Sequence, residues 1–154
     1  MTKITKAIIP VAGWGTRRLP ITKTIEKCML PIGNRPIIDY IVQDCIVAGI
    51  NEIIFAVGER STQLQEYYRS NIPLNDFLKR HGKSDMLGLV APLPGVTLHF
   101  VIQPSYGKQG TAVPVAIASE YVNEGETVAV IMGDDFFYNQ DGSSEIARLL
   151  DGTV

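Results

Sequence analysis

Residues 6–20 read KAIIPVAGWGTRRLP, a short apolar run that leads directly into a loop rich in glycine and arginine. An apolar run of this length that ends at a glycine, here residues 6–12, is typical of a strand buried inside a parallel sheet. The following glycines, Gly13 and Gly15, permit backbone conformations that bring N–H groups close to phosphate oxygens. The stretch therefore predicts a buried first strand with a loop able to bind an anion at its end.

The alternation of strand and helix continues along the chain. Apolar runs predict three further strands, at residues 52–57, 96–102 and 127–132. Apolar spacing, together with proline, glycine or serine near the ends, predicts helices at residues 36–49, 62–69, 110–122 and 143–150. Strands that alternate with helices form parallel sheets with right-handed crossovers. We therefore expect an α/β fold, a three-layer sandwich around a mainly parallel sheet.

Residues 71–94 interrupt this rhythm. They can form a short amphipathic helix near residues 74–80, followed by a loop, and they lie between a predicted helix and a predicted strand. We interpret them as an insertion in a single domain that spans residues 1–154.

Composition and charge narrow the classes of partner. The chain is 45% hydrophobic and 19% charged, with a net charge of −2, so no basic field indicates binding to nucleic acid or to an anionic membrane. The apolar run near the N-terminus is too short for a signal peptide, and no stretch is long enough to span a bilayer. The only cysteines, Cys28 and Cys45, are expected to be buried, reduced thiols in a cytoplasmic protein.

Three polar segments follow the ends of predicted strands, at residues 13–23, 103–110 and 133–135. Ligands of parallel α/β sheets bind at the carboxyl ends of the strands. The three segments therefore predict a single site along one edge of the sheet.

Two cations, one in the first segment and one shortly after it, are candidates for binding phosphate. Arg17 carries a guanidinium fork suited to two phosphate oxygens, although a plain turn with a surface arginine would look the same. Lys27 precedes an apolar Met-Leu-Pro that would anchor it, although a single lysine is more often a solvated surface charge. The loop lacks the third glycine of a dinucleotide-binding fingerprint and is not a P-loop.

The combination of these motifs is more specific than any one of them. The pattern GxGTR(x)LP, followed by KxMLP and by a helix that begins at a proline, resembles the family of sugar-1-phosphate nucleotidylyltransferases over essentially the whole chain. The resemblance implies a nucleotide-diphospho-sugar transferase fold, which is Rossmann-like. It also implies catalytic roles for Arg17 and Lys27, and it implies nucleotide binding by Ala12, Gly13, Gly15, Thr16 and Arg17.

The same resemblance assigns the other two segments. Gln103 and Gly110 would recognise the base, because an amide can pair with both a donor and an acceptor. Taken alone, Gln103 would be interpreted first as a turn residue. Asp134 would hold Mg²⁺, which prefers oxygen ligands and phosphates. Asp135 is the neighbouring alternative, but it is also suited to cap a turn or a helix.

Within the family, residues 71–94 and the opening of the chain resemble the uridylyltransferases that act on glucose 1-phosphate. The implied reaction converts UTP and glucose 1-phosphate to UDP-glucose and pyrophosphate. Two segments depart from that group, Gly133-Asp134 and Gly110-Thr111-Ala112. A thymidylyltransferase for glucose 1-phosphate and a non-catalytic nucleotide-binding module therefore remain as alternatives.

Length is the largest departure from the family. The fold of the family has further strands, which carry a sugar-binding carboxylate, a lysine on the phosphates and a second metal-binding aspartate. We therefore expect these 154 residues to be the N-terminal, nucleotide-binding part of a truncated fold. A truncated sheet exposes an edge strand and an apolar face, so we also expect a homo-oligomer.

Overall fold

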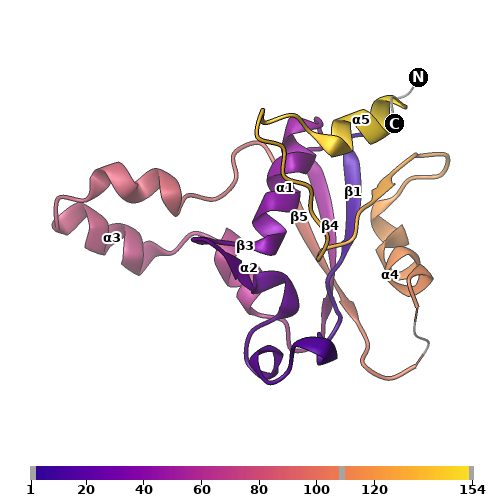
Figure 1. The fold of residues 1–154 in the computed structure, drawn as a ribbon, viewed down its shortest axis with the longest axis horizontal. Helices are drawn as coiled ribbons and strands as arrows, with labels where there is room; N and C mark the ends of the chain where they lie inside the picture. The colour runs from indigo at the N-terminus through magenta and orange to yellow at the C-terminus, as the bar shows by residue number, and fades with distance from the viewer. Residues whose placement is uncertain (1–2, 108–109, 153–154) are drawn as a thin grey trace.

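The computed structural model describes residues 3–107 and 110–152, so two residues of the polar segment 103–110 lie outside the description. It has a four-stranded sheet with helices on both faces (Figure 1). The order of the strands is β5-β4-β1-β6, and all three pairings are parallel. The bounds of the strands are β1 (Lys6–Pro10), β4 (Glu52–Gly58), β5 (Thr97–Gln103) and β6 (Ala129–Val130). The prediction of a mainly parallel sheet in an α/β fold is confirmed.

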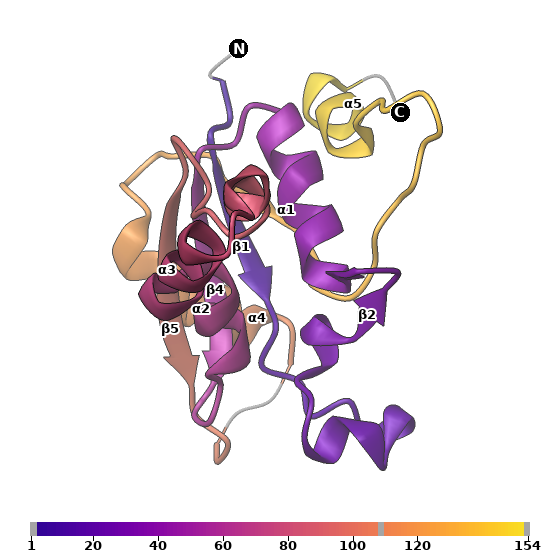
Figure 2. The same ribbon diagram turned by 90° about the vertical axis from the view of Figure 1, so that its left-hand side faces the viewer.

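The helices form the two outer layers (Figure 2). One face of the sheet is covered by α1 (Ile37–Val47), α2 (Gln63–Tyr68) and α5 (Glu145–Asp151). The other face is covered by α4 (Ala112–Ile117) and the 3₁₀ helix η5 (Ala118–Tyr121). The predicted three-layer sandwich is therefore present.

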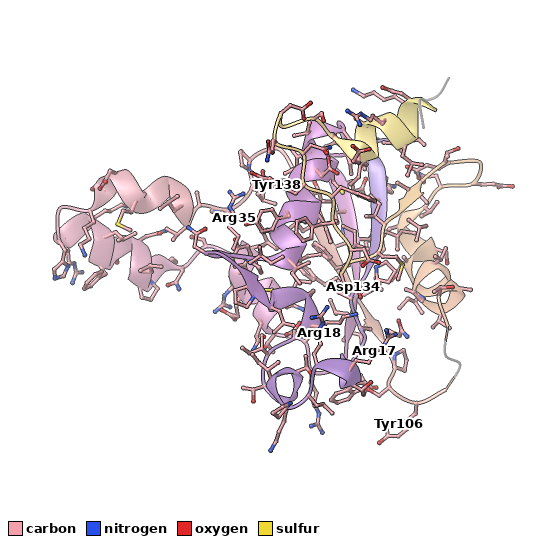
Figure 3. All side chains as sticks on the ribbon, viewed as in Figure 1. Arg17, Arg18, Arg35, Tyr106, Asp134 and Tyr138 are labelled. Carbon is pink, nitrogen blue, oxygen red and sulfur yellow. The ribbon has the colours of Figure 1, made fainter. Side chains whose placement is uncertain are left out.

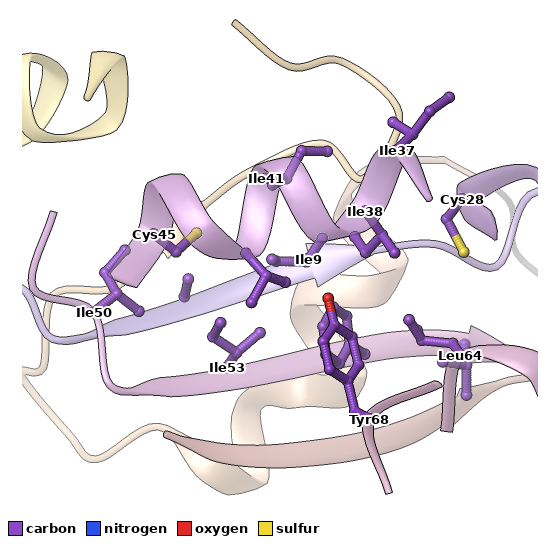
Figure 4. Close-up of a cluster of buried hydrophobic side chains, with 14 of the residues drawn as sticks. Ile9, Cys28, Ile37, Ile38, Ile41, Cys45, Ile50, Ile53, Leu64 and Tyr68 are labelled. Atoms are coloured by element: carbon purple, nitrogen blue, oxygen red, sulfur yellow. The ribbon is translucent and has the colours of Figure 1, made fainter. Parts of the chain in front are cut away.

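The two cores follow from the alternation of side chains along a strand. Ala7 and Ile9 point towards α1, whereas Ile8 points towards α4 and η5. The larger core packs the apolar face of α1 on β1 and β4, where Ile38, Ile41 and Cys45 are almost fully buried (Figure 4). Strands buried on both faces explain why the sequence shows continuous apolar runs rather than an alternating pattern.

Helix ends are set by the residues that the sequence suggested. The side chain of Ser144 accepts a hydrogen bond from the backbone N–H of Ala147 at 2.8 Å, which caps α5. Gly49, with φ of 87°, ends the turn after α1 in a conformation that glycine adopts easily. Pro114 lies in the first turn of α4, where its missing N–H costs no hydrogen bond.

Four local features differ from the prediction. The strand predicted at 127–132 pairs only over β6, and the helix predicted at 110–122 divides into α4 and η5. A small hairpin and three single-turn 3₁₀ helices were not predicted, because elements this short have no hydrophobic period. Their bounds are β2 (Pro31–Ile32), β3 (Arg35–Pro36), η1 (Thr16–Arg18), η2 (Ile21–Lys23) and η3 (Lys27–Met29).

The insertion forms an arm that projects from the body of the molecule (Figure 1). It contains α3 (Ile72–Arg80), capped by the side chain of Asn71, and the 3₁₀ helix η4 (Ser84–Leu89). The helix predicted near residues 74–80 is therefore present and begins two residues earlier. In the described parts of the chain, we find no helix with the length and hydrophobicity that a membrane span requires.

In the described parts of the chain, Gly133 is the glycine at which a Cβ atom would collide with the backbone. A Cβ atom on Gly133 would lie 2.3 Å from Cγ1 of Val11 and 2.9 Å from the carbonyl oxygen of Pro10. Gly133 is what allows the segment after β6 to lie against the end of β1.

We therefore expect Gly133→Ala to lower the free energy of unfolding by about 1–3 kcal/mol, the usual cost of forcing extra atoms into a packed site. Gly88→Ala is the matched control, because nothing lies within 4 Å of its Cβ position. Urea denaturation of both variants measures the difference. Equal stability of the two variants would contradict the close packing of Gly133.

Candidate active site

The three predicted ligand segments lie at one edge of the sheet. Parallel pairing brings the carboxyl ends of β1, β4 and β5 to the same edge, and Gln103 stands beside Gly58 in the register. The loops that follow β1 and β5 extend from this edge, away from the end where the chain termini lie (Figure 2). This is where parallel α/β sheets bind ligands.

The centre of the site is an ion pair between Lys27 and Asp134. The Lys27 ammonium contacts Oδ2 of Asp134, although the two residues are 107 positions apart in the sequence. Their side chains are 29% and 30% exposed, so the pair is sheltered but remains open to solvent and to a ligand. The pair brings the continuation of the first predicted segment against the third.

The stem of Lys27 packs against the glycine loop. Gly15 has φ of 63°, and a Cβ atom built on it would lie 3.2 Å from Cβ of Lys27 and 3.0 Å from Cγ2 of Thr22. The hydroxyl of Thr22 donates a hydrogen bond to the carbonyl oxygen of Gly15 at 2.9 Å. Gly15 therefore serves both the left-handed turn and the close packing of Lys27.

The backbone on the other side of Lys27 is anchored in the core. Cys28 is buried, and burial raises the pKa of its thiol to about 12, with Glu26 as a further cause. The thiol is therefore protonated at neutral pH and serves as an apolar anchor, as expected for Cys28. Cys45, in α1, is also a free and buried cysteine.

The two adjacent aspartates after β6 face different surroundings. Ile131 donates a backbone hydrogen bond to Ile8, so the chain still follows β1 just before Asp134. Asp134 then reaches Lys27, whereas Asp135 lines a cavity of about 280 Å³ between β6, α1 and α5. Most side chains that line this cavity are apolar, such as Phe136 and Leu149, but the carboxylates of Asp44 and Glu145 line it too.

The other phosphate-binding candidates of the glycine loop differ in exposure. Ala12 is half-buried, Gly13 is exposed, and Thr16 and Arg17 are exposed in η1. Figure 3 shows Arg17 and Arg18 at the same end of the molecule as Asp134. Arg17 is therefore free to move towards an anion, in contrast to Lys27, whose ammonium already has a partner.

The base-recognition candidates lie further along the same edge. Gln103 is the last residue of β5 and is half-buried, and Gly110 is exposed with φ of 123°. β4 separates β5 from β1, so these residues are set apart from Lys27 in the sheet. Such a spread suits an elongated ligand better than a single ion.

The donor set for a metal ion is small. Within residues 3–107 and 110–152 there is no cluster of three or more histidine, cysteine, aspartate or glutamate side chains arranged to hold a metal. A single partly exposed carboxylate fits Mg²⁺, which takes one or two protein carboxylates and completes its shell with phosphates and water. Asp134 fits such a metal only if a ligand supplies further oxygens.

Sequence reasoning missed two residues that shape the site. Thr22 and Gly133 belong to no periodic pattern, and each matters through a contact with a segment that only the fold brings near. Thr22 lies in the predicted segment 13–23 and Gly133 in the predicted segment 133–135, but neither was expected to act through packing.

Comparison with known proteins gives consistent matches. A model of the nucleotidyl transferase family matches residues 6–151. A UTP–glucose-1-phosphate uridylyltransferase of Streptococcus pyogenes is 41% identical over 135 residues, which is 88% of this chain and 43% of that protein.

Solved structures with a similar fold include two from Acinetobacter baumannii. A UTP-bound UGPase aligns with a TM-score of 0.87 and 30% identity over 97% of this chain. A UDP-glucose pyrophosphorylase aligns with a TM-score of 0.89 and 31% identity, again over 97% of this chain. The chain covers 52% of each, so it spans about half the length of the relatives that it matches.

Proposed function

This chain belongs to the nucleotidyl transferase family, and on that premise we propose that it is the nucleotide-binding part of a UTP–glucose-1-phosphate uridylyltransferase. The observation that carries the proposal is the Lys27–Asp134 pair beside the glycine loop. A cation for phosphates and a carboxylate for a metal then stand together at the edge where such sheets bind ligands. The names of the relatives, including a UTP-bound structure, support UTP as the nucleotide.

The first segment would bind the triphosphate. The backbone of Ala12, Gly13 and Gly15, with Thr16, would face the β- and γ-phosphates, and Arg17 would close on them as a movable cation. Lys27 would neutralise charge around the reacting phosphates. Its packing against Gly15 supports this role, because a pre-positioned cation loses little freedom when the ligand binds.

The proposed reaction needs no general base. An oxygen of the glucose 1-phosphate anion forms a bond to the α-phosphorus of UTP, while the bond from that phosphorus to the bridging oxygen breaks and pyrophosphate leaves. The nucleophile is already charged, so catalysis consists of alignment and charge neutralisation by Arg17 and Lys27. The residues that bind the sugar are not assigned in this chain.

Mg²⁺ is the proposed cofactor, and Asp134 is its proposed ligand. When bound, the ion would neutralise phosphate charge and act as a Lewis acid. Asp134 lies beside Lys27 at the strand end, whereas Asp135 is exposed beside a separate cavity whose lining includes no lysine or arginine. The phosphates would lie near Lys27, so this placement favours Asp134 of the two. Lys27 contacts only Oδ2 of Asp134, and a carboxylate has a second oxygen that would serve the ion.

Gln103 and Gly110 would recognise the base. The exposed fraction of Gly110 and its φ of 123° support a position where a flat base can approach the backbone. A thymidylyltransferase would use the same elements, so base choice is the part of the proposal that most needs a direct test. The proposed substrates also imply a cytoplasmic enzyme of carbohydrate biosynthesis, a compartment in which free thiols such as Cys28 and Cys45 persist.

Isothermal titration with UTP and dTTP tests the site. We expect UTP to bind more tightly than dTTP, and Arg17→Ala and Gln103→Ala each to weaken UTP binding about tenfold, the worth of one hydrogen bond to a charged group. Arg80→Ala is the control, because Arg80 lies on the arm. If UTP binds and only Arg80→Ala weakens it, the nucleotide lies elsewhere.

The metal role is tested by measuring UTP affinity with and without Mg²⁺. We expect Mg²⁺ to strengthen UTP binding to the unmodified chain, and Asp134→Asn to abolish that gain with little change in stability, since size and polarity are kept. Asp135→Asn should retain the gain. The reverse result would assign the metal to Asp135.

We also propose that the chain self-associates through the β6 edge. Within the described residues, β6 pairs with β1 alone, and apolar side chains on and after it are exposed, with Val130 at 47% and Phe137 at 71%. Sedimentation velocity should show oligomers whose population falls in Val130→Lys but not in Leu89→Lys on the arm. A monomer at high concentration in the unmodified chain would reject this interface.

A further inference from the structure

Glu26, the residue before Lys27, is bound to the start of α2. Its carboxylate accepts hydrogen bonds at 2.7–2.8 Å from three groups across 35–37 positions of sequence: the hydroxyl of Ser61 and the backbone N–H groups of Thr62 and Gln63. A carboxylate with three donors is held in one orientation, so the backbone at Glu26 is fixed as well.

The contact takes the place of a helix cap. Thr62 is the N-cap residue of α2, but its side chain makes no capping hydrogen bond. Glu26 supplies the acceptor from a distant segment, where the dipole of a helix favours negative charge. The start of α2 therefore depends on the loop that carries Lys27.

The side chain of Gln63 in turn bonds to the backbone of the Lys27 loop. Its side-chain oxygen accepts the backbone N–H of Glu26 at 2.9 Å, and its side-chain nitrogen donates to the carbonyl oxygen of Thr24 at 2.8 Å. The two side chains thus exchange hydrogen bonds with each other's backbone. α2 itself is fixed to the sheet through Leu64, which is fully buried.

These contacts fix Lys27 from one side while Gly15 packs against its stem and Asp134 holds its ammonium. We propose that Glu26 and Gln63 form a clasp that positions Lys27 for the triphosphate, an inference that rests on the proposed nucleotide site. Glu26 is then a positioning residue, since it acts through Lys27. A simple helix cap would stabilise α2 without affecting the Lys27 ammonium.

The position of Lys27 can be tested without any nucleotide. The test measures, by mass spectrometry, the rate at which the side-chain amine of Lys27 is acylated. Glu26→Ala and Gln63→Ala should each raise the acylation rate of Lys27 about threefold, because a displaced ammonium loses its carboxylate partner. Glu26→Gln keeps an acceptor for the backbone N–H groups and should restore most of the protection. Glu66→Ala removes an exposed carboxylate from α2 itself and should change nothing.

Lys6 is the internal reference. It is buried at the opposite end of β1, where it donates to the carbonyl oxygen of Tyr121 at 2.6 Å and pairs with Glu126 at 3.1 Å. Its acylation rate should stay constant in every variant. An unchanged rate at Lys27, an equal rise in Glu66→Ala, or a parallel rise at Lys6 would each overturn the clasp, the last because it would reveal a purely structural role.

UTP affinity gives the second readout through a double-mutant cycle. Glu26→Ala should weaken UTP binding about fivefold in the unmodified chain and leave it unchanged in a Lys27→Ala background, because coupled residues are not additive. Equal losses in both backgrounds would mean that Glu26 does not act through Lys27. If the unmodified chain does not bind UTP, the proposed function fails, whereas the acylation experiment still decides whether the clasp positions Lys27.

Discussion

β1 is hydrogen-bonded on both sides, to β4 along Lys6–Pro10 and to β6 at Ala7 and Ile8, and both partners run parallel to it. This parallel pairing determines where the loops emerge. The glycine loop after β1 and the aspartates after β6 leave the sheet side by side, so a lysine and an aspartate far apart in sequence can form an ion pair. If β6 ran antiparallel to β1, the aspartates would emerge at the opposite edge and could not meet Lys27.

Two glycines make the close approach at that edge possible, for different reasons. Gly15 combines a left-handed backbone with contact against Lys27 and Thr22. Gly133 has no room for a Cβ atom, because the end of β1 occupies that space. One glycine therefore positions the cation and the other positions the carboxylate, and both do so by omitting a side chain.

The sequence predicted the parts of the fold that depend on burial. β1 and β4 were predicted to within two residues, because their continuous apolar runs reflect cores on both faces of the sheet. β5 was predicted to within one residue at each end, although it lies at the sheet edge and is only partly buried. β6 was predicted too long, since an apolar run indicates burial but does not say how many residues find a partner strand. The strand-end position of the site followed from the same pattern, and resemblance to a family supplied the candidate roles of Lys27 and Asp134.

Other features of the site could not be predicted because they are tertiary contacts between polar residues. Glu26 bonds to Ser61, Thr62 and Gln63 across more than thirty positions of sequence, and no period or motif marks such a pairing. Thr22 is a similar case, since its hydroxyl matters only because the loop folds back on Gly15. Both belong to irregular segments, where sequence patterns carry the least information.

The short pairing of β6 affects the order in which the parts of the site fold. Lys27 and the glycine loop precede Asp134 by about a hundred residues, so a growing chain can assemble the cation half before the carboxylate half has been made. Contacts between residues far apart in the sequence form slowly. Strands with few backbone hydrogen bonds, such as β6, fray most readily. The segment after β6 that carries Asp134 should therefore be the last part of this edge to fold and the first to open. In the opened state, the glycine loop and Lys27 keep their positions while Asp134 has detached from Lys27.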